Sequence, residues 1–289
     1  MTGLVEQAPA KINLTLRIVG RRADGYHELE SLVAFAGVSD TLRLEPGTAL
    51  GLDISGSYAG ACGCAADNLV LKAVAALGER APGLKAGHFH LQKNLPVAAG
   101  IGGGSSDAAA ALRLLARANG LLKDDPRVAA AAIAVGADVP VCLNPQTRIM
   151  RGIGEDLSEA LWLPALPAVL VNPGVPLSTR DVFAKFSSAQ ASKKPLGKLP
   201  TWPEGLIDYL AAQGNDLTEA AIVCAPAVGD VLATLRALPG VLLARMSGSG
   251  STCFALLPSA EEAAAAAHRL RAEHSRWWVA ATAFGQAAT

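Results

Sequence analysis

Apolar and polar residues alternate strictly near the start of the chain, over residues 11–18. The apolar positions, which share one side of an extended chain, are Ile12, Leu14, Leu16 and Ile18. This period of two predicts a half-buried strand. Lys11 and Asn13 then project together from the polar side, about 7 Å apart by the rise of a strand. An ordinary solvated face is the simpler explanation of that spacing.

Further strands and helices follow from the same kind of pattern. Apolar runs predict strands at residues 41–44, 88–93, 168–172, 241–246, 252–257 and 277–283. Helical periodicity with capping residues predicts helices near residues 69–77, 107–115, 126–135, 204–212, 216–224, 227–238 and 259–274. The mixture predicts an α/β protein of mixed sheets packed with helices, and 289 residues leave room for two domains.

A glycine-rich segment, residues 96–107 with the sequence PVAAGIGGGSSD, stands before the second of these helices. Its four glycines within five positions can turn sharply and take positive φ. Ser105, Ser106 and Asp107 are suitable N-cap residues. A helix start has unpaired amides and the positive end of the helix dipole, so the segment predicts a phosphate-binding turn. A loop that only packs a helix against a strand is the alternative.

The two common phosphate motifs do not describe this turn. No lysine follows the glycines, as G-x-x-x-x-G-K-[ST] requires, and Ser105 occupies the third glycine position of G-x-G-x-x-G. Lys93 lies just before the turn and can reach a phosphate as a point charge.

Asp138 lies between a helix stop, Gly136, and Pro140. A carboxylate fixed there can accept a proton from an alcohol. An aspartate that caps the local backbone is an equally ordinary feature of such a turn. Tyr26 and His27 follow an Asp-Gly turn and place an aromatic ring and a ring donor on an exposed loop, where binding groups are common; an idle hairpin tip is the alternative.

Two loops and one histidine pair complete the candidate features. Residues 247–251, SGSGS, predict a flexible, hydroxyl-rich loop that either closes on a ligand or only connects two strands. The polar stretch Ser187–Pro203 predicts a mobile surface loop. His88 and His90 share the polar side of one strand, but no third ligand is apparent nearby, so a metal site is not expected.

Composition restricts the class of protein. The chain is 51% hydrophobic and 17% charged, with 25 basic and 25 acidic residues, which indicates a folded protein without affinity for nucleic acid or anionic membranes. No apolar run is long enough to span a membrane, and the first residues do not resemble a signal peptide. Five cysteines without a pairing pattern favour reduced thiols and a cytoplasmic setting. The oligomeric state is left open, and a homodimer is compatible with the sequence.

Three segments together resemble the GHMP small-molecule kinases. Residues 96–106 are similar to the family's P-x-x-x-G-L-G-G-G-S-S phosphate loop, residues 10–14 (AKINL) resemble its first motif, and residues 246–254 (MSGSGSTCF) resemble its third. Residues 24–29 (DGYHEL), the triple glycine and residues 136–140 (GADVP) are similar to one branch, whose substrate is an alcohol linked to cytidine diphosphate in the non-mevalonate route to isoprenoids. The resemblance runs in order from residue 8 to about residue 257.

The resemblance implies a two-domain GHMP kinase fold, divided here as residues 1–155 and 156–289, with the active site in the cleft between the domains. It implies transfer of the γ-phosphoryl group of ATP to a hydroxyl of this small molecule. Asp138 matches the base and Lys11 its neighbour. The positions that match ATP-binding residues are Lys93, Pro96, Val97, Ala98, Ala99, Gly100, Ile101, Gly102, Gly103, Gly104, Ser105 and Ser106.

The substrate side is also implied by the resemblance. Asn13, Tyr26, His27 and Thr179 match substrate contacts, and Tyr26 and Phe183 match two rings that sandwich a cytosine, with His27 free to bond the base edge. No acidic residue matches a dedicated Mg²⁺ ligand, so the ion is expected on the ATP phosphates, with no metal site of the protein's own.

The sequence departs from the family pattern in places. Ile101 replaces a leucine, Ala98 and Ala99 replace a more glycine-rich lead-in, and residues 178–183 match loosely. Two alternatives remain open. One is another GHMP kinase, acting on homoserine, mevalonate or a sugar. The other is a catalytically silent protein of the same fold that binds a ligand.

Overall fold

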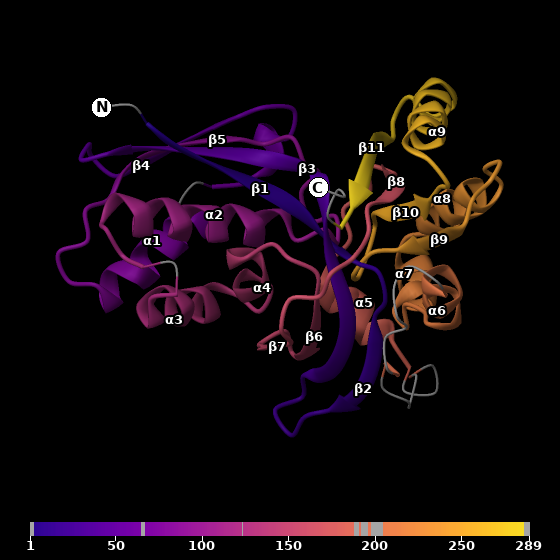
Figure 1. Ribbon diagram of the computed structural model, residues 1–289, viewed down its shortest axis with the longest axis horizontal. Coiled ribbons are helices and arrows are strands. Elements are labelled where there is room, and N and C mark those ends of the chain that lie inside the picture. Colours follow the sequence, from indigo (N-terminus) through magenta and orange to yellow (C-terminus); the bar gives the residue numbers. More distant parts are fainter. Residues whose placement is uncertain are drawn as a thin grey trace. The chain divides into compact units, whose positions relative to one another are not determined.

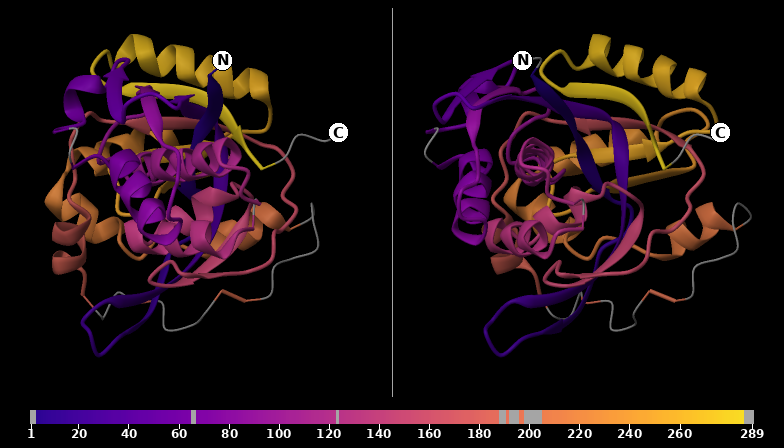
Figure 2. Two further views of the ribbon diagram at one scale, coloured as in Figure 1. Left: turned by 90° about the vertical axis from the view of Figure 1, so that its left-hand side faces the viewer. Right: turned by 60° about the vertical axis from the view of Figure 1, so that its left-hand side comes forward.

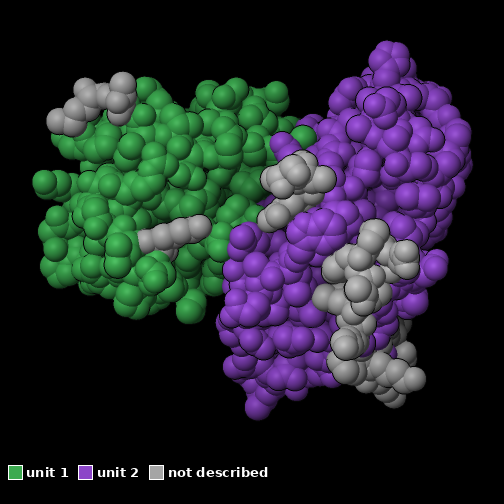
Figure 3. Space-filling model, viewed as in Figure 1, with its two compact units in different colours: residues 1–11, 38–97, 102–145 green, residues 12–37, 98–101, 146–289 purple. Residues whose placement is uncertain are grey.

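The computed structural model describes residues 3–64, 67–122, 124–187, 191, 196–197 and 205–285 (Figure 1, Figure 2). Packing divides the chain into two compact units, coloured separately in Figure 3. Unit 1 comprises Met1–Lys11, Val38–Val97 and Gly102–Pro145, and unit 2 comprises Ile12–Gly37, Ala98–Ile101 and Gln146–Thr289. The domains 1–155 and 156–289 stay a prediction. The packing units have other bounds, because residues 12–37 and 146–155 pack with the C-terminal part of the chain.

Unit 1 is a sheet with helices on one face (Figure 1). Its elements are the first part of β1 (Leu4–Asn13), the second part of β3 (His27–Pro46), β4 (Gly51–Ser55), the short 3-10 helix η1 (Ala59–Ala61), α1 (Leu69–Arg80), β5 (Gly87–Gln92), α2 (Gly103–Ala118), α3 (Pro126–Val135) and α4 (Val139–Leu143). Strand β5 pairs in parallel with β4 and antiparallel with β3. Phe89 and Leu91 of β5 are buried on the helix side, so His88 and His90 point to the opposite face.

Local signals fix the ends of the unit 1 helices. Asn68 Oδ1 accepts a hydrogen bond from Val70 N at 2.9 Å and caps α1. Asp125 caps α3 in the same way, and Pro126 occupies its first position. Both helix starts confirm the prediction. Helix α2 is buried along its alanine run, Ala108–Ala111, because small side chains let α1 and α4 pack closely against it.

Unit 2 is built on an antiparallel sheet. Its elements are the rest of β1 and β3, with β2 (Arg17–Arg21), β6 (Arg148–Gly152), β7 (Asp156–Leu157), β8 (Leu166–Asn172), α5 (Thr179–Lys185), α6 (Leu206–Ala212), α7 (Thr218–Cys224), α8 (Ala227–Arg236), β9 (Leu243–Met246), β10 (Cys253–Leu256), α9 (Ala260–Glu273) and β11 (Trp278–Phe284). Strands pair in the order β9-β10-β8-β11, and β11 reaches β3 through Phe284 and Ala36. Strands β2 and β6 also pair with β3.

The core of unit 2 lies between this sheet and its helices. Val171 of β8, Leu232 of α8 and Leu270 of α9 belong to one buried cluster. Helix α9 runs along β11 (Figure 2) and is capped by Ser259, whose hydroxyl accepts a hydrogen bond from Glu262 N. None of the helices in the described ranges is both long and apolar enough to cross a membrane.

The first predicted strand is interrupted. Strand β1 ends at Asn13, the chain bends at Leu14, and β2 begins only at Arg17. The polar side is also not solvated, since Lys11, Asn13 and Thr15 are 4%, 1% and 0% exposed. Buried polar groups need partners, and Thr15 Oγ1 accepts from Leu32 N at 2.9 Å. The simple solvated face is therefore wrong. The segment Ser187–Pro203, predicted to be mobile, lies mostly outside the described residues.

Candidate active site

Lys11 and Asp138 form an ion pair in unit 1. Asp138 occupies the N-cap position of α4, just after Gly136, yet its side chain makes no capping bond. Instead, Asp138 Oδ2 accepts a hydrogen bond from Lys11 Nζ at 2.8 Å. The Lys11 side chain is 6% exposed and that of Asp138 is 32% exposed. A buried ammonium therefore fixes a carboxylate that stays partly accessible, and such a carboxylate can accept a proton from an alcohol.

The glycine turn starts α2 earlier than predicted. Gly102 is the N-cap residue with φ 61°, and the helix begins at Gly103. The predicted caps, residues 105–107, lie inside the first turns, and the first helical bond runs from Ser106 N to Gly102 O at 2.9 Å. Glycine takes the left-handed conformation without a steric penalty, so the helix can begin within the glycines. The amides of residues 103–105 precede the first bond and face the end of the helix, where anions bind.

Many of the residues that match ATP-binding positions are buried. The buried ones are Lys93, Pro96, Ala99, Ile101 and Ser106. Ser106 Oγ donates to Pro9 O at 2.7 Å. These side chains shape the turn rather than meet a ligand. Contact with a ligand therefore falls to the backbone of the turn and to side chains that are more accessible, such as Ser105.

Lys93 lies in a buried cluster of charges next to the start of α2. Its ammonium donates to Asp107 Oδ2 at 2.6 Å and also to Asp40 Oδ2. None of the three side chains is more than 4% exposed. A Cβ atom on Gly103 would lie 3.3 Å from Lys93 Nζ, so the cluster packs directly under the turn. The sequence identified Lys93 and gave Asp107 only as a helix cap, whereas Asp40 carried no signal.

Burial and neighbouring charges in this cluster shift the pKa values of Asp107 and Lys93. Burial raises the pKa of Asp107 to about 7, the Asp40 charge adds to this, and the Lys93 charge opposes it. Burial lowers the pKa of Lys93, but the two carboxylates outweigh burial and raise it. The second carboxylate oxygen of Asp107 is buried without a hydrogen-bond partner among the described residues. The lysine therefore stays charged while the two aspartates compete for it.

Residues 98–101 lie against the loop of residues 247–251 within unit 2. A Cβ atom on Gly100 would lie 2.4 Å from Gly250 O, so this approach requires glycine. Ser247 Oγ donates to Gly100 O at 3.1 Å. All five loop residues are buried. The structure thus packs the loop predicted to be flexible into a hydrogen-bonded position.

Asn13 is buried in unit 2 with one polar atom unpaired. Its Nδ2 donates to Ser31 Oγ at 2.7 Å, and its backbone N donates to Ser247 Oγ at 3.1 Å. Asn13 Oδ1 has no hydrogen-bond partner among the described residues. An unpaired buried acceptor costs about 1–3 kcal/mol, so this oxygen is a candidate to accept from a ligand. Ser31 carried no sequence signal, and only its position beside Asn13 identifies it.

Aromatic rings gather beside His27 in unit 2. The rings of His27 and Phe183 stack at 5.2 Å with 23° between their planes, and Phe186 meets His27 edge-on at 5.6 Å. Burial, assisted by the Arg21 charge, lowers the pKa of His27. Tyr26 is 63% exposed. Phe183 therefore faces His27, and a base sandwiched by Tyr26 and Phe183 stays a prediction.

Thr179 is the first residue of α5 and shares a hydrogen bond between hydroxyls with Ser249 at 2.8 Å. The hydroxyl of Ser178, one residue earlier, caps the helix and frees Thr179 for this contact. Unit 2 thus brings Thr179 to the buried loop, Asn13 to Ser247 and His27 to a phenylalanine. Unit 1 independently brings Lys11 to Asp138 and Lys93 to the helix start.

Comparison with known proteins defines the class. Residues 68–145 match the model of the GHMP kinases N terminal domain, and residues 202–276 match that of the GHMP kinases C terminal. The fold is that of the GHMP kinases, a class of ATP-dependent small-molecule kinases. The chain is also similar to solved structures of other members, such as a homoserine kinase from Cytophaga hutchinsonii with a TM-score of 0.71, at 18% identity over 99% of this chain and 96% of that one.

Closer relatives narrow the class to one family. A 4-diphosphocytidyl-2-C-methyl-D-erythritol kinase from Methylobacterium radiotolerans is 56% identical over 98% of this chain and 99% of its own. A solved 4-(cytidine 5'-diphospho)-2C-methyl-D-erythritol kinase is 34% identical with a TM-score of 0.79, covering 98% of this chain and all of that one (100%). This chain belongs to the 4-diphosphocytidyl-2-C-methyl-D-erythritol kinase family.

Proposed function

We propose that this kinase transfers the γ-phosphoryl group of ATP to the 2-hydroxyl of 4-diphosphocytidyl-2-C-methyl-D-erythritol, in the non-mevalonate pathway to isoprenoids. The products are the 2-phosphate and ADP. The structural observation that carries the chemistry is the Lys11–Asp138 pair at 2.8 Å, which lies in the same unit as the helix start of the glycine turn. Identity of 56% over nearly the whole chain supports the choice of substrate.

Asp138 is the proposed general base. The substrate hydroxyl oxygen attacks the γ-phosphorus, its proton passes to the Asp138 carboxylate, and the bond from the γ-phosphorus to the bridging oxygen breaks to release ADP. Lys11 orients the carboxylate through its 2.8 Å hydrogen bond. General-base assistance of this kind contributes about 10²–10⁴ in rate.

We propose that the backbone amides of residues 103–105 donate hydrogen bonds to the phosphates of ATP. They stand at the N-terminus of the 16-residue helix α2, where the dipole favours negative charge. Lys93 acts differently from the expectation, because its ammonium is already bound by Asp40 and Asp107. We assign it a positioning role: it fixes the turn from below, while Ser105 and the backbone meet the phosphates.

Mg²⁺ is proposed to arrive with ATP. Two carboxylates beside the turn, Asp40 and Asp107, are bound by Lys93 and are at most 4% exposed, so neither is accessible to an ion on the turn. We therefore propose that the phosphates of ATP and water molecules bind the Mg²⁺ ion. The ion would neutralise phosphate charge during transfer.

The ring cluster of unit 2 is proposed to receive the cytosine. A base stacked on an aromatic ring gains about 1–3 kcal/mol, and His27 and Phe183 already stack on each other at 5.2 Å. We propose that the base lies against Phe183 and that Tyr26, exposed in its turn, supplies the other ring. We propose that Asn13 Oδ1 and the Thr179 hydroxyl form hydrogen bonds with polar groups of the same substrate.

The test is ADP release by the purified enzyme with ATP and each candidate alcohol. Activity with the cytidylyl substrate, absent with homoserine and mevalonate, is the expected result. The reverse pattern would assign a different kinase of the class, and ATP binding without ADP release on any alcohol would identify a silent member. We also place the enzyme in the cytoplasm, which its five free cysteines support.

A further inference from the structure

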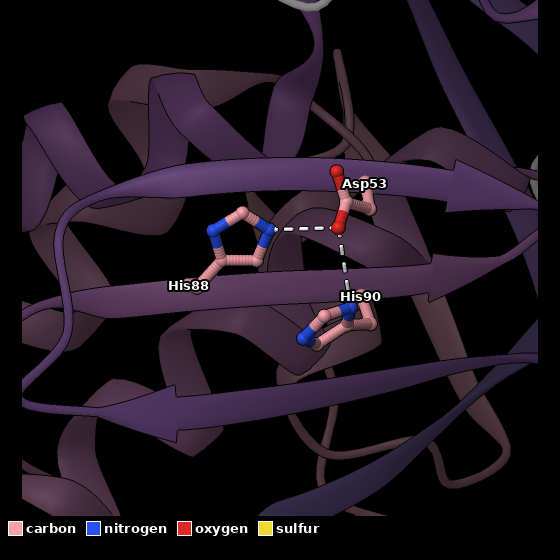
Figure 4. Close-up of side chains that lie close together, drawn as sticks. All are labelled: Asp53, His88 and His90. Atoms are coloured by element: carbon pink, nitrogen blue, oxygen red, sulfur yellow. Dashed lines mark hydrogen bonds and ion pairs between the residues drawn. The ribbon is translucent and has the colours of Figure 1, made fainter.

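Three side chains with metal-binding atoms converge on the outer face of the unit 1 sheet. His88 and His90 extend from β5 on the face opposite the helices, and Asp53 extends toward them from β4 (Figure 4). The parallel pairing of β4 with β5 sets Asp53 directly opposite His90 and Gly51 directly opposite His88. Asp53 is the third ligand that the sequence did not reveal, because its strand lies more than 30 residues earlier in the chain.

The distances suit a metal ion. Asp53 Oδ2 lies 3.0 Å from His88 Nε2 and 3.5 Å from His90 Nδ1. Ligand atoms around a tetrahedral zinc ion with bonds of about 2.0–2.2 Å lie about 3.3–3.6 Å apart. The three ligand atoms all lie within 4.8 Å of one another, so a small rotation of the two partly exposed imidazoles closes the set.

We propose that Asp53, His88 and His90 bind a divalent transition-metal ion such as Zn²⁺. Two imidazole nitrogens and one carboxylate oxygen form a donor set that suits zinc, nickel or copper, whereas Mg²⁺ and Ca²⁺ prefer oxygen alone. Water completes the coordination, since the site is open to solvent on the Asp53 side, where the side chain is 70% exposed.

The surroundings orient both imidazoles. A Cβ atom on Gly51 would lie 2.5 Å from His88 Nδ1, so the glycine leaves the space in which the ring lies across β4. His90 Nε2 lies 3.5 Å from Glu45 Oε1, which is in turn held by Arg43 Nη2 at 2.7 Å. His90 Nε2 has no hydrogen-bond partner among the described residues, so Glu45 is placed to accept from it when the ring turns onto the metal, which would strengthen metal binding.

The site is separate from the kinase chemistry. Its ligands lie on the face of the sheet opposite the helices, whereas the glycine turn begins one of those helices. Strand β4 pairs only with β5 among the described strands, so a metal bridging Asp53 and the two histidines would fasten this edge strand to its neighbour. The proposed role is therefore structural.

The experiment measures Zn²⁺ affinity of the metal-stripped full chain, without nucleotide, by competition with a chromophoric chelator. One bound Zn²⁺ is expected. His88→Ala and His90→Ala should each weaken binding about 100-fold or more, and Glu45→Gln about tenfold. His268→Ala, an exposed histidine on α9, is the matched control and should change nothing. Melting curves in EDTA should coincide for all variants.

Two further measurements separate this site from other binding. Gly51→Ala keeps every ligand but displaces the His88 ring, so it should also weaken Zn²⁺ binding. Co²⁺ should give visible d–d absorption without a thiolate charge-transfer band. Absence of Zn²⁺ binding, unchanged affinity in the His88→Ala/His90→Ala double variant, or loss of binding in Cys62→Ser/Cys64→Ser would each overturn the proposal.

Discussion

Replacing Lys93 by methionine should destabilise this protein strongly, because its ammonium is buried between two aspartates. Methionine keeps most of the length and apolar stem of lysine but removes the ammonium. Asp40 and Asp107 then face each other without a cation, and their side chains are 0% and 4% exposed. Neither carboxylate can turn to water for compensation.

The magnitude follows from what each aspartate retains. Asp40 Oδ1 still accepts from the backbone N of Asn94 at 2.6 Å and of Leu95 at 2.8 Å. Asp107 keeps nothing comparable, because its Oδ1 is already unpaired among the described residues. Removing one partner of a buried ion pair typically costs about 3–5 kcal/mol, and we expect Lys93→Met to lower the free energy of unfolding by that amount near neutral pH.

The contribution of Asp107 to the stability of the wild-type protein should depend on pH. The pKa of Asp107 is about 7 in the folded protein, mainly because of burial, against about 3.9 when unfolded. The folded state therefore binds the extra proton between those values, and the contribution of Asp107 to stability falls as pH rises from about 4 to about 7. Asp107→Asn mimics the protonated form, so it should gain stability relative to wild type over this window.

Urea unfolding at pH 5 and pH 8, followed by circular dichroism, provides the assay. Lys72→Met is the matched control: its ammonium lies 3.7 Å from Asp67 at an exposed site, and the change should stay within about 0.5 kcal/mol. Suppose instead that Lys93→Met unfolds like wild type at pH 8 while ATP affinity collapses. Lys93 would then be a phosphate ligand, and the positioning role would be refuted.

Three other substitutions test the proposed site. Asp138→Asn should lower kcat about 10²–10⁴-fold, while the Kd of ATP, measured by calorimetry, should stay the same. Wild-type kcat in this variant would rule out Asp138 as the general base. Gly104→Ala places a Cβ atom at an ordinary 3.4 Å from Leu69, so the fold should survive while ATP affinity drops at least about tenfold. Gly78→Ala, whose Cβ meets nothing, is its control and should leave ATP affinity unchanged. Phe183→Ala should raise the KM for the cytidylyl substrate about 5- to 150-fold. An unchanged KM would show that the cytosine does not stack on Phe183.

The features that the sequence predicted correctly depend on neighbours in the chain. The caps of α1 and α3 follow from Asn68 and Asp125 because a cap acts on the next two or three residues. The start of α2 was predicted too late because the prediction considered only how well each residue caps a helix. Serine and aspartate are better caps than glycine in isolation, but Gly102 can take φ 61° and the chain uses that freedom first.

The contacts that the sequence could not supply join distant segments. Lys11 meets Asp138 across 127 positions, and Lys93 meets Asp40 across 53. Alternation marked Lys11 as polar but not whether its side was solvated, because burial of a strand's second face depends on elements elsewhere in the chain. Asp53 joins the histidine pair only through parallel strand pairing, whose register no local pattern specifies.

The glycine turn shows how these two kinds of information combine. Local chemistry supplies the amides of residues 103–105, which any helix start would offer. Their position comes from buried contacts. Ser106 Oγ donates a hydrogen bond to Pro9 O at 2.7 Å, and Lys93 packs so close to Gly103 that an added Cβ atom would lie 3.3 Å from its Nζ. Because the side chains that hold the turn are buried, substitutions there act on ATP through the position of backbone amides. A loss of ATP affinity at such a residue is therefore evidence of a ligand contact only when stability is measured alongside it.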